Sequence, residues 1–180
     1  MVILQEIAGY CLIGLIFIVC LGVFWLPVFL LMKRRMSFRK QAAYFLFTAC
    51  VLVILAATVL DVFLIGLLGG EDILAAERLI NIVPFRVFTE AWAMGGHKQI
   101  AQIIANILMF VPLGFLTPAA FPKMRSWQKT ALSMALFSFS IEFVQYFIGR
   151  CADVDDFMLN TAGGIAGYAI FSVIFKLWKK

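Results

Sequence analysis

Long apolar runs constrain this chain more than any other feature. A helix needs about 20 mostly apolar residues to cross a bilayer, and five stretches meet that length: Ile7–Met32, Gln41–Leu68, Gln99–Ala120, Lys129–Ile148 and Phe157–Leu177. The runs are continuous rather than alternating, which favours helices over the strands of a membrane barrel. We therefore predict an all-α fold, a polytopic membrane helix bundle of about five transmembrane helices in which residues 1–180 form a single membrane domain.

Composition excludes a water-soluble globule. The chain is 64% hydrophobic and 14% charged, with a mean hydropathy of +1.01, whereas soluble domains are about half apolar and a quarter charged. We interpret the first run as a retained spanning helix, because it is longer than the core of a signal peptide. The four cysteines follow no disulfide or zinc spacing, and no nucleotide-binding loop is present. We therefore expect no cofactor.

The basic residues predict an orientation. With five spans, eleven Lys and Arg residues fall on the side that carries Lys33–Lys40, Pro122–Lys129 and the C-terminal tail, and four fall on the other side. Cytoplasmic loops collect Lys and Arg, so we predict a cytoplasmic C-terminus and an outer N-terminus. This distribution accounts for the net charge of +5 without a nucleic-acid partner, and leaves membrane lipids as the expected partners.

The connection Gly69–Lys98 is long and rich in apolar residues. A loop in water would not carry so many, and aromatic side chains such as Phe85, Phe88 and Trp92 are typical of the headgroup level of a membrane. We therefore predict an interfacial or re-entrant element between the second and third transmembrane helices.

Polar residues inside the apolar runs are candidates for function, because an ionisable group in a membrane is costly. Glu142 and Gln145 share one face of the fourth run with Ser138, and Asn106 shares a face of the third run with Gln99 and Gln102. By the predicted orientation, these groups lie toward the outer leaflet. The alternative is hydrogen bonding between helices, which polar side chains also provide in membranes.

An acidic cluster precedes the fifth run. Asp153 is placed to cap that helix, with Asp155 and Asp156 in its first turn. Capping explains one aspartate better than three, and close carboxylates suit Mg²⁺ or Ca²⁺, but no calcium-loop pattern is present, so the metal stays unknown. Gly163 and Gly167 continue the face of Asp156, and their spacing permits close approach of another helix, from this chain or from a second copy in an oligomer.

Four motifs resemble the VanZ-like family over about residues 81–168. They are Asn81-Ile-Val-Pro-Phe85, Asn106-x-x-x-Phe110-x-Pro112-x-Gly114, Ser140-x-Glu142-x-x-Gln145, and Arg150-x-x-Asp153-x-Asp155-Asp156-x-x-x-Asn160-Thr161-x-Gly163-Gly164-x-x-Gly167. The resemblance implies a small polytopic protein of the bacterial cytoplasmic (inner) membrane. The family is named for a member that raises resistance to teicoplanin, a lipoglycopeptide that targets cell-wall precursors, although many members have no antibiotic context.

Three functional hypotheses follow. The first is a protein of the cell envelope that binds an anionic or isoprenoid-linked lipid at the outer leaflet and contributes to glycopeptide resistance. Its predicted ligand-binding residues are Asn81, Arg86, Asn106, Gln145, Arg150, Asp153, Asp155 and Asn160. The second is a membrane-embedded enzyme acting on a lipid-linked substrate, with Glu142 and Asp156 as catalytic residues and Asp153, Asp155 or Asp156 holding a metal. The third is a scaffold subunit of a helix bundle.

Overall fold

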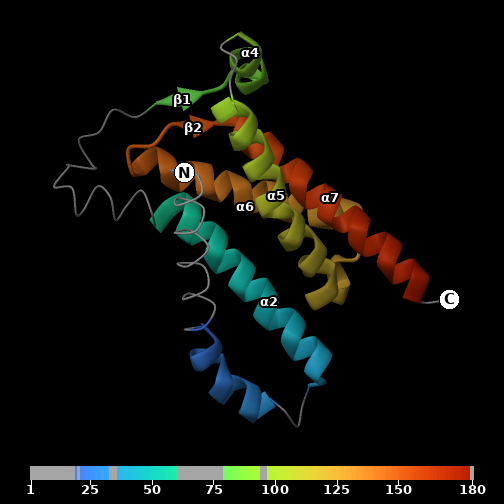
Figure 1. Ribbon diagram of the computed structural model, residues 1–180. Coiled ribbons are helices and arrows are strands. Elements are labelled where there is room, and N and C mark those ends of the chain that lie inside the picture. Colours follow the sequence, from blue (N-terminus) through green and yellow to red (C-terminus); the bar gives the residue numbers. More distant parts are fainter. Residues whose placement is uncertain (1–18, 20, 33–35, 61–78, 94–96, 179–180) are drawn as a thin grey trace. The chain divides into compact units, whose positions relative to one another are not determined.

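The computed structural model describes residues 19, 21–32, 36–60, 79–93 and 97–178 (Figure 1). Within them, four helices are long and apolar enough to cross a membrane: Phe38–Leu60, Gln99–Ala120, Trp127–Phe147 and Val154–Trp178. The prediction of an all-α membrane helix bundle is confirmed. The described part of the predicted first span contains a shorter apolar helix, Leu21–Met32. Residues 7–18 and 20 of that span, and residues 61–68 of the second predicted span, lie outside the described residues.

The chain divides into two compact units, Met1–Val53 and Ile54–Lys180. In the first unit, the helix Leu21–Met32 packs against α2 (Phe38–Leu55) through aromatic pairs. The rings of Trp25 and Phe45 lie 5.9 Å apart, and those of Phe29 and Phe38 lie 6.1 Å apart, both edge to face. This is the geometry that aromatic quadrupoles favour.

The second unit is built around three long helices, α5 (His97–Ala120), α6 (Trp127–Phe147) and α7 (Val154–Trp178). A short 3-10 turn, η2 (Pro122–Met124), joins α5 to α6. Phe115 of α5 packs on Phe171 of α7, with ring centroids 5.8 Å apart, and Phe110 of α5 packs equally close to Phe137 of α6. Because contacts advance together along α5 and α7 but in reverse along α6, the first two helices run parallel and α6 runs antiparallel to both (Figure 1).

Glycines allow α5 and α7 to touch backbone to backbone. A Cβ atom added at Gly163 would overlap the carbonyl of Ile107, and one added at Gly167 would overlap the carbonyl of Val111. Gly114 of α5 meets the backbone of Gly164 in the same way. The face of Gly163 and Gly167 is therefore occupied inside the chain by α5. The sequence spacing does not say which helix will fill such a face, and an oligomer contact through it stays a prediction.

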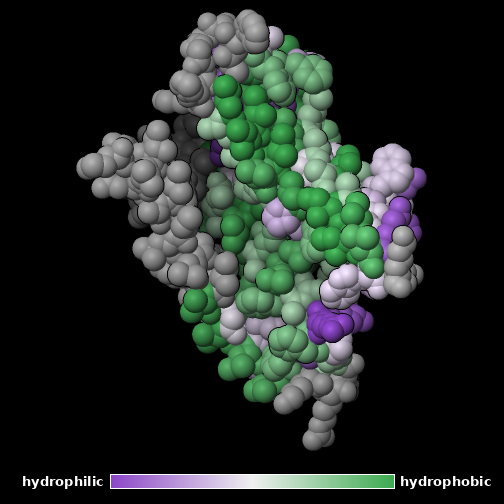
Figure 2. Space-filling model, turned by 45° about the vertical axis from the view of Figure 1, so that its right-hand side comes forward, coloured by the Kyte–Doolittle hydropathy of each residue, from purple (hydrophilic) through white to green (hydrophobic). Residues whose placement is uncertain are grey.

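The sides of the helices that face away from this packing are apolar. Along α6, Leu132, Leu136, Phe139 and Phe143 form an exposed stripe at helical spacing, each more than half exposed. Figure 2 shows a face of the molecule that is predominantly hydrophobic. Lipid tails are the solvent that such a surface requires.

Two short strands join distant parts of the second unit. β1 (Ile80–Asn81) pairs in parallel with β2 (Ala152–Asp153), with Asn81 opposite Asp153. The short helix α4 (Arg86–Ala93) follows β1. Of the predicted interfacial element, residues 69–78 and 94–96 lie outside the described residues. The described part is a strand and a short helix with exposed Ile80, Ile82, Phe85 and Phe88, which is the apolar surface expected at a membrane interface.

Candidate functional site

The polar residues of the second unit gather where α5 begins, α6 ends and α7 begins. The parallel and antiparallel directions of the three helices bring these ends together, and the β1–β2 pair adds Asn81 to them. We call this region the polar end. Its hydrogen-bonded residues come from six segments of the chain and comprise Thr58, Asn81, Gln102, Asn106, Ser138, Glu142, Gln145, Asp153, Asp155, Asp156 and Asn160.

Asp153 starts α7 and holds β1 beside it. Its Oδ1 accepts the backbone N–H of Asp155 at 2.8 Å, which is an N-cap bond. The same oxygen accepts the side-chain amide of Asn81 at 3.0 Å, and the Oδ1 of Asn81 in turn accepts the N–H of Val83 at 3.2 Å. The predicted capping role of Asp153 is confirmed, and Asn81 is shown to order the turn after β1.

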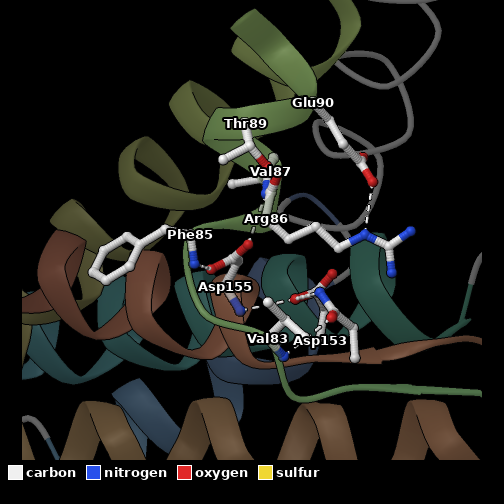
Figure 3. A network of polar contacts seen from close by, with 9 residues as sticks. Val83, Phe85, Arg86, Val87, Thr89, Glu90, Asp153 and Asp155 are labelled. Carbon is white, nitrogen blue, oxygen red and sulfur yellow. Dashed lines mark hydrogen bonds and ion pairs between the residues drawn. The ribbon is translucent and has the colours of Figure 1, made fainter. Parts of the chain in front are cut away.

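Asp155 fixes the start of α4 from across the fold. One of its oxygens accepts the backbone N–H of Phe85, and the other accepts that of Val87 at 2.8 Å (Figure 3). Phe85 has a φ of 66°, in the left-handed region that a non-glycine residue rarely adopts. The carboxylate, only 2% exposed, therefore satisfies the free N–H groups at a helix start, and both its oxygens are engaged within the protein.

Asp156 faces α5 instead. Its Oδ1 accepts the side-chain amide of Gln102 at 3.0 Å and that of Asn106, so the predicted polar stripe of the third run meets the acidic cluster. Glu142, which is 7% exposed, accepts the backbone N–H of Asp153 at 2.8 Å. The two predicted catalytic carboxylates thus approach the same place from α6 and α7, within electrostatic reach of each other.

Two further amides link α6 to its neighbours. The Nδ2 of Asn160 donates to the hydroxyl of Ser138 at 3.0 Å, and the Nε2 of Gln145 donates to the carbonyl of Thr58 at 2.9 Å. Thr58 lies in the π-helical turn η1 (Ala56–Leu60), which ends the described part of the second span. The remaining amide oxygens, Oε1 of Gln145 and Oδ1 of Asn160, are buried and accept no hydrogen bond from the part of the chain that the structure describes.

The two predicted phosphate-binding arginines stay exposed at the rim. Arg86 pairs with Glu90 one helical turn along α4, at 2.7 Å, and lies within electrostatic reach of Asp153. Arg150 follows the left-handed Gly149 that ends α6, and its backbone N–H donates to the carbonyl of Gln145. Its guanidinium makes no salt bridge to a described residue.

Three members of the polar end were not among the predicted site residues. Gln102 and Ser138 lie on the polar helix faces that the sequence displays, so their spacing carried a signal. Thr58 contributes its main-chain carbonyl, which no side-chain pattern reveals. Asp153, Asp155 and Asp156, of which any was predicted as a possible metal ligand, have different hydrogen-bond partners. No group of three or more His, Cys, Asp or Glu able to hold a metal lies within the described ranges.

Comparisons with known proteins place these residues in a family. The sequence profile of the VanZ/LLP1 family matches residues 62–176. The chain is also similar to Protein VanZ of Enterococcus faecium, with 28% identity over 98 residues, which are 54% of this chain and 55% of that protein. The chain thus spans about half the length of this curated relative, and no solved structure matches. Because the family match covers most of the chain and contains α5, α6 and all but the last two residues of α7, this membrane protein belongs to the VanZ/LLP1 family.

Proposed function

We propose that this protein binds a lipid with an anionic head group, through the exposed Arg86 and Arg150 at the rim of the polar end. The observation that carries the proposal is the placement of these two side chains. Both are exposed, at an end of helices whose sides are apolar. Arg86 lies within electrostatic reach of the half-buried Asp153, and Arg150 within electrostatic reach of the buried Glu142 and Asp156. A lipid phosphate beside them would have its tails along those sides.

The arginine fork matches the chemistry of phosphate. A guanidinium presents several N–H donors in a plane and binds phosphate oxygens in pairs. Arg150 has no competing salt bridge among the described residues, and the pair of Arg86 with Glu90 is on the surface, where such a pair contributes little. Asn81, Asp153 and Asp155 support binding indirectly, because they hold the segment that carries Arg86.

The neutral polar groups would add selectivity. Asn106, Gln145 and Asn160 lie behind the rim, where amides can contact the sugar or peptide groups of a lipid-linked cell-wall intermediate. We infer that the polar end lies at the outer leaflet of the bacterial cytoplasmic membrane, with an outer N-terminus and a cytoplasmic C-terminus, because the basic side chains concentrate at the opposite loops and the tail. Cell-wall lipid intermediates with phosphate head groups are exposed at that leaflet.

Native mass spectrometry of the purified protein tests lipid binding. We expect retention of phosphatidylglycerol or an isoprenoid phosphate in preference to zwitterionic phosphatidylcholine. Arg150→Gln and Arg86→Gln should each weaken binding several-fold. Lys176→Gln is a matched control, because Lys176 is exposed in the last turn of α7, at the far end of the same helix. Equal retention of all lipids, or equal losses in the three variants, would contradict the proposal.

Binding of a cell-wall intermediate would affect glycopeptide action, as the family resemblance implies. We propose that expression raises the teicoplanin concentration that inhibits growth, and that Arg150→Gln lowers this protection while Lys176→Gln does not. Growth inhibition in a susceptible bacterial host measures the effect. Unchanged susceptibility alongside intact lipid binding would separate the resistance proposal from the binding proposal and overturn only the former.

The enzymatic alternative has one supporting observation. Glu142 and Asp156 each keep a carboxylate oxygen that accepts no hydrogen bond from the described residues, as a general base or acid requires. In this version the two residues act on a bound lipid-linked substrate. A general base typically accelerates a reaction about 10²–10⁴-fold. The rate of product formation from candidate lipids should therefore fall by about 100-fold or more in Glu142→Gln. Full function in Glu142→Gln and Asp156→Asn would exclude it.

A further inference from the structure

Four polar side chains line the seam between α6 and α7. Ser138 and Glu142 are four residues apart on α6, and Asp156 and Asn160 are four residues apart on α7, so each pair projects from one face of its helix. The helices are antiparallel, and the Asn160–Ser138 hydrogen bond joins the deeper members of the two pairs. All four are at most 9% exposed. We call these residues the α6–α7 seam.

The seam holds more acceptor oxygens than donors. One oxygen of Glu142 accepts the N–H of Asp153, and Oδ1 of Asp156 accepts the two amides from α5. The second oxygen of each carboxylate accepts no hydrogen bond from a described residue. Among the oxygens of the seam, the Oδ1 of Asn160 is fully buried and has no donor within the described residues, and its amide donates from α7 across to α6, one turn below both carboxylates. A buried acceptor without a partner, such as this one, is rare and indicates a missing group.

The charges of the carboxylates in the seam also indicate a missing group. Two carboxylates lie within electrostatic reach of each other in the seam. Arg150 is within electrostatic reach of both, but it is exposed and forms no salt bridge with a described residue. A buried charge normally has a cation or a metal as its partner.

We propose that the α6–α7 seam binds one hard cation, Ca²⁺ or Mg²⁺, through the free oxygens of Glu142, Asp156 and Asn160. Both ions take carboxylate and amide oxygens as ligands. Facing helices that each supply side chains one turn apart are a known way to build a metal site inside a bundle. Ser138 positions the Asn160 amide. A dication would neutralise both carboxylates and join α6 to α7. This site is separate from the lipid site at the rim, and of the three aspartates it uses Asp156 alone.

Direct metal binding gives the first test. The full chain, purified in detergent and stripped with a chelator, is equilibrated with CaCl₂ or MgCl₂ and passed through a desalting column. We expect close to one bound ion per chain for one of the two salts. The ion that is retained in the larger amount is the one that the site prefers. At a concentration about 100 times the dissociation constant, the unfolding temperature should rise by roughly 5–10 °C. No bound ion and no shift with either salt would overturn the proposal.

Three variants separate a site from general ionic effects. Glu142→Gln and Asp156→Asn keep the shape of the side chain and remove one charge each, so both should lose the bound ion and at least three quarters of the temperature shift. Glu90→Gln removes a partly exposed carboxylate on α4, and this variant should retain the bound ion and the temperature shift. Equal responses in all three variants would assign the effect to the surface and overturn the seam. If a variant fails to fold, the metal content of the wild type and of Asn160→Ala decides.

The cation-free state distinguishes a metal from a proton. With a metal site, Glu142→Gln relieves repulsion and is more stable than the wild type in chelator but less stable than the wild type in the preferred salt. This crossing of the two stabilities is the expected result. The alternative result is that the wild type loses stability as the pH rises and that neither salt changes its unfolding temperature. In that case a proton occupies the seam and the cation proposal is overturned. Neither readout needs a lipid ligand.

Discussion

The same two helices, α5 and α7, meet in two different ways along their length. Toward the polar end, Asp156 reaches out to the amides of Gln102 and Asn106. About two and three turns further, Gly163 and Gly167 lie directly on the backbone of α5. The first contact is made by side-chain tips, and the second leaves no space for a side chain at all.

The difference shows where this fold can carry function. Backbone contact gives dense packing and a fixed distance between helices, but it offers no chemical group to a ligand. At the polar end the contacts are made by side chains, and one oxygen each of Glu142, Asp156 and Asn160 accepts no hydrogen bond from a described residue. We infer that the glycine contact positions α7, and that this positioning sets the geometry of the polar end above it.

The largest expected effect comes from breaking the glycine contact. Gly167→Ala places a methyl group into the carbonyl of Val111, and because backbone cannot yield as a side chain does, we expect a loss of about 2–3 kcal/mol or more. Thermal unfolding in detergent measures it. Gly22→Ala is the matched control, because nothing lies within 4 Å of a Cβ there. A stable Gly167→Ala protein would show that the two helices are not locked by shape.

Removing the charge of Asp155 tests the polar contacts. Asp155→Asn presents an NH₂ group to one of two backbone N–H donors, those of Phe85 and Val87. Bonds to charged groups contribute about 1.5–3 kcal/mol each, so we expect a local loss of that size. Hydrogen exchange should accelerate in residues 85–93 and stay unchanged in α7 beyond its first turns. Glu90→Gln, on the surface of α4, should leave exchange unaltered. A uniform acceleration along the chain would contradict a local role.

A smaller effect is expected one turn deeper. Ser138→Ala removes the acceptor of the Asn160 amide, and hydrogen bonds between membrane helices average about 0.6 kcal/mol, with a maximum near 1.7. Unfolding in detergent should detect a loss in this range. Ser140→Ala is the control, because the exposed Ser140 hydroxyl bonds only to the carbonyl of Leu136 in its own helix. If both variants behave alike, the bond between helices adds nothing.

The smallest expected effect concerns the reactivity of the Cys151 thiol, at the edge of the polar end. Burial, and after it the carboxylate of Asp153, raises the pKa of the exposed Cys151 thiol above its usual value. The thiolate is the reactive form, so labelling with an impermeant maleimide should be slower than for an ordinary thiol at neutral pH and should rise only at higher pH.

The same label sharpens the orientation. Intact cells should be labelled from outside, and the signal should vanish in Cys151→Ser. A label that reaches Cys151 only after the cells are opened would reverse the predicted orientation of the polar end.

Residue pattern alone predicted much of the bundle and part of the site. Helical spacing placed Ser138, Glu142 and Gln145 on one face, and helix-capping rules identified Asp153. Spacing does not specify which helices face each other. The different partners of Asp153, Asp155 and Asp156 were therefore not visible, because one turn of helix directs neighbouring side chains to different sides.

What the sequence determined by itself is that the chain is a membrane helix bundle, since runs of this length and hydropathy have no other stable solvent. Only the tertiary structure decided that Asp155 holds α4, that Asp156 meets α5, and that Gly163 and Gly167 contact α5 of the same chain. The physical reason is that burial of apolar surface in lipid is governed by composition. The pairing of polar groups depends instead on the parallel and antiparallel directions of helices that are far apart in sequence.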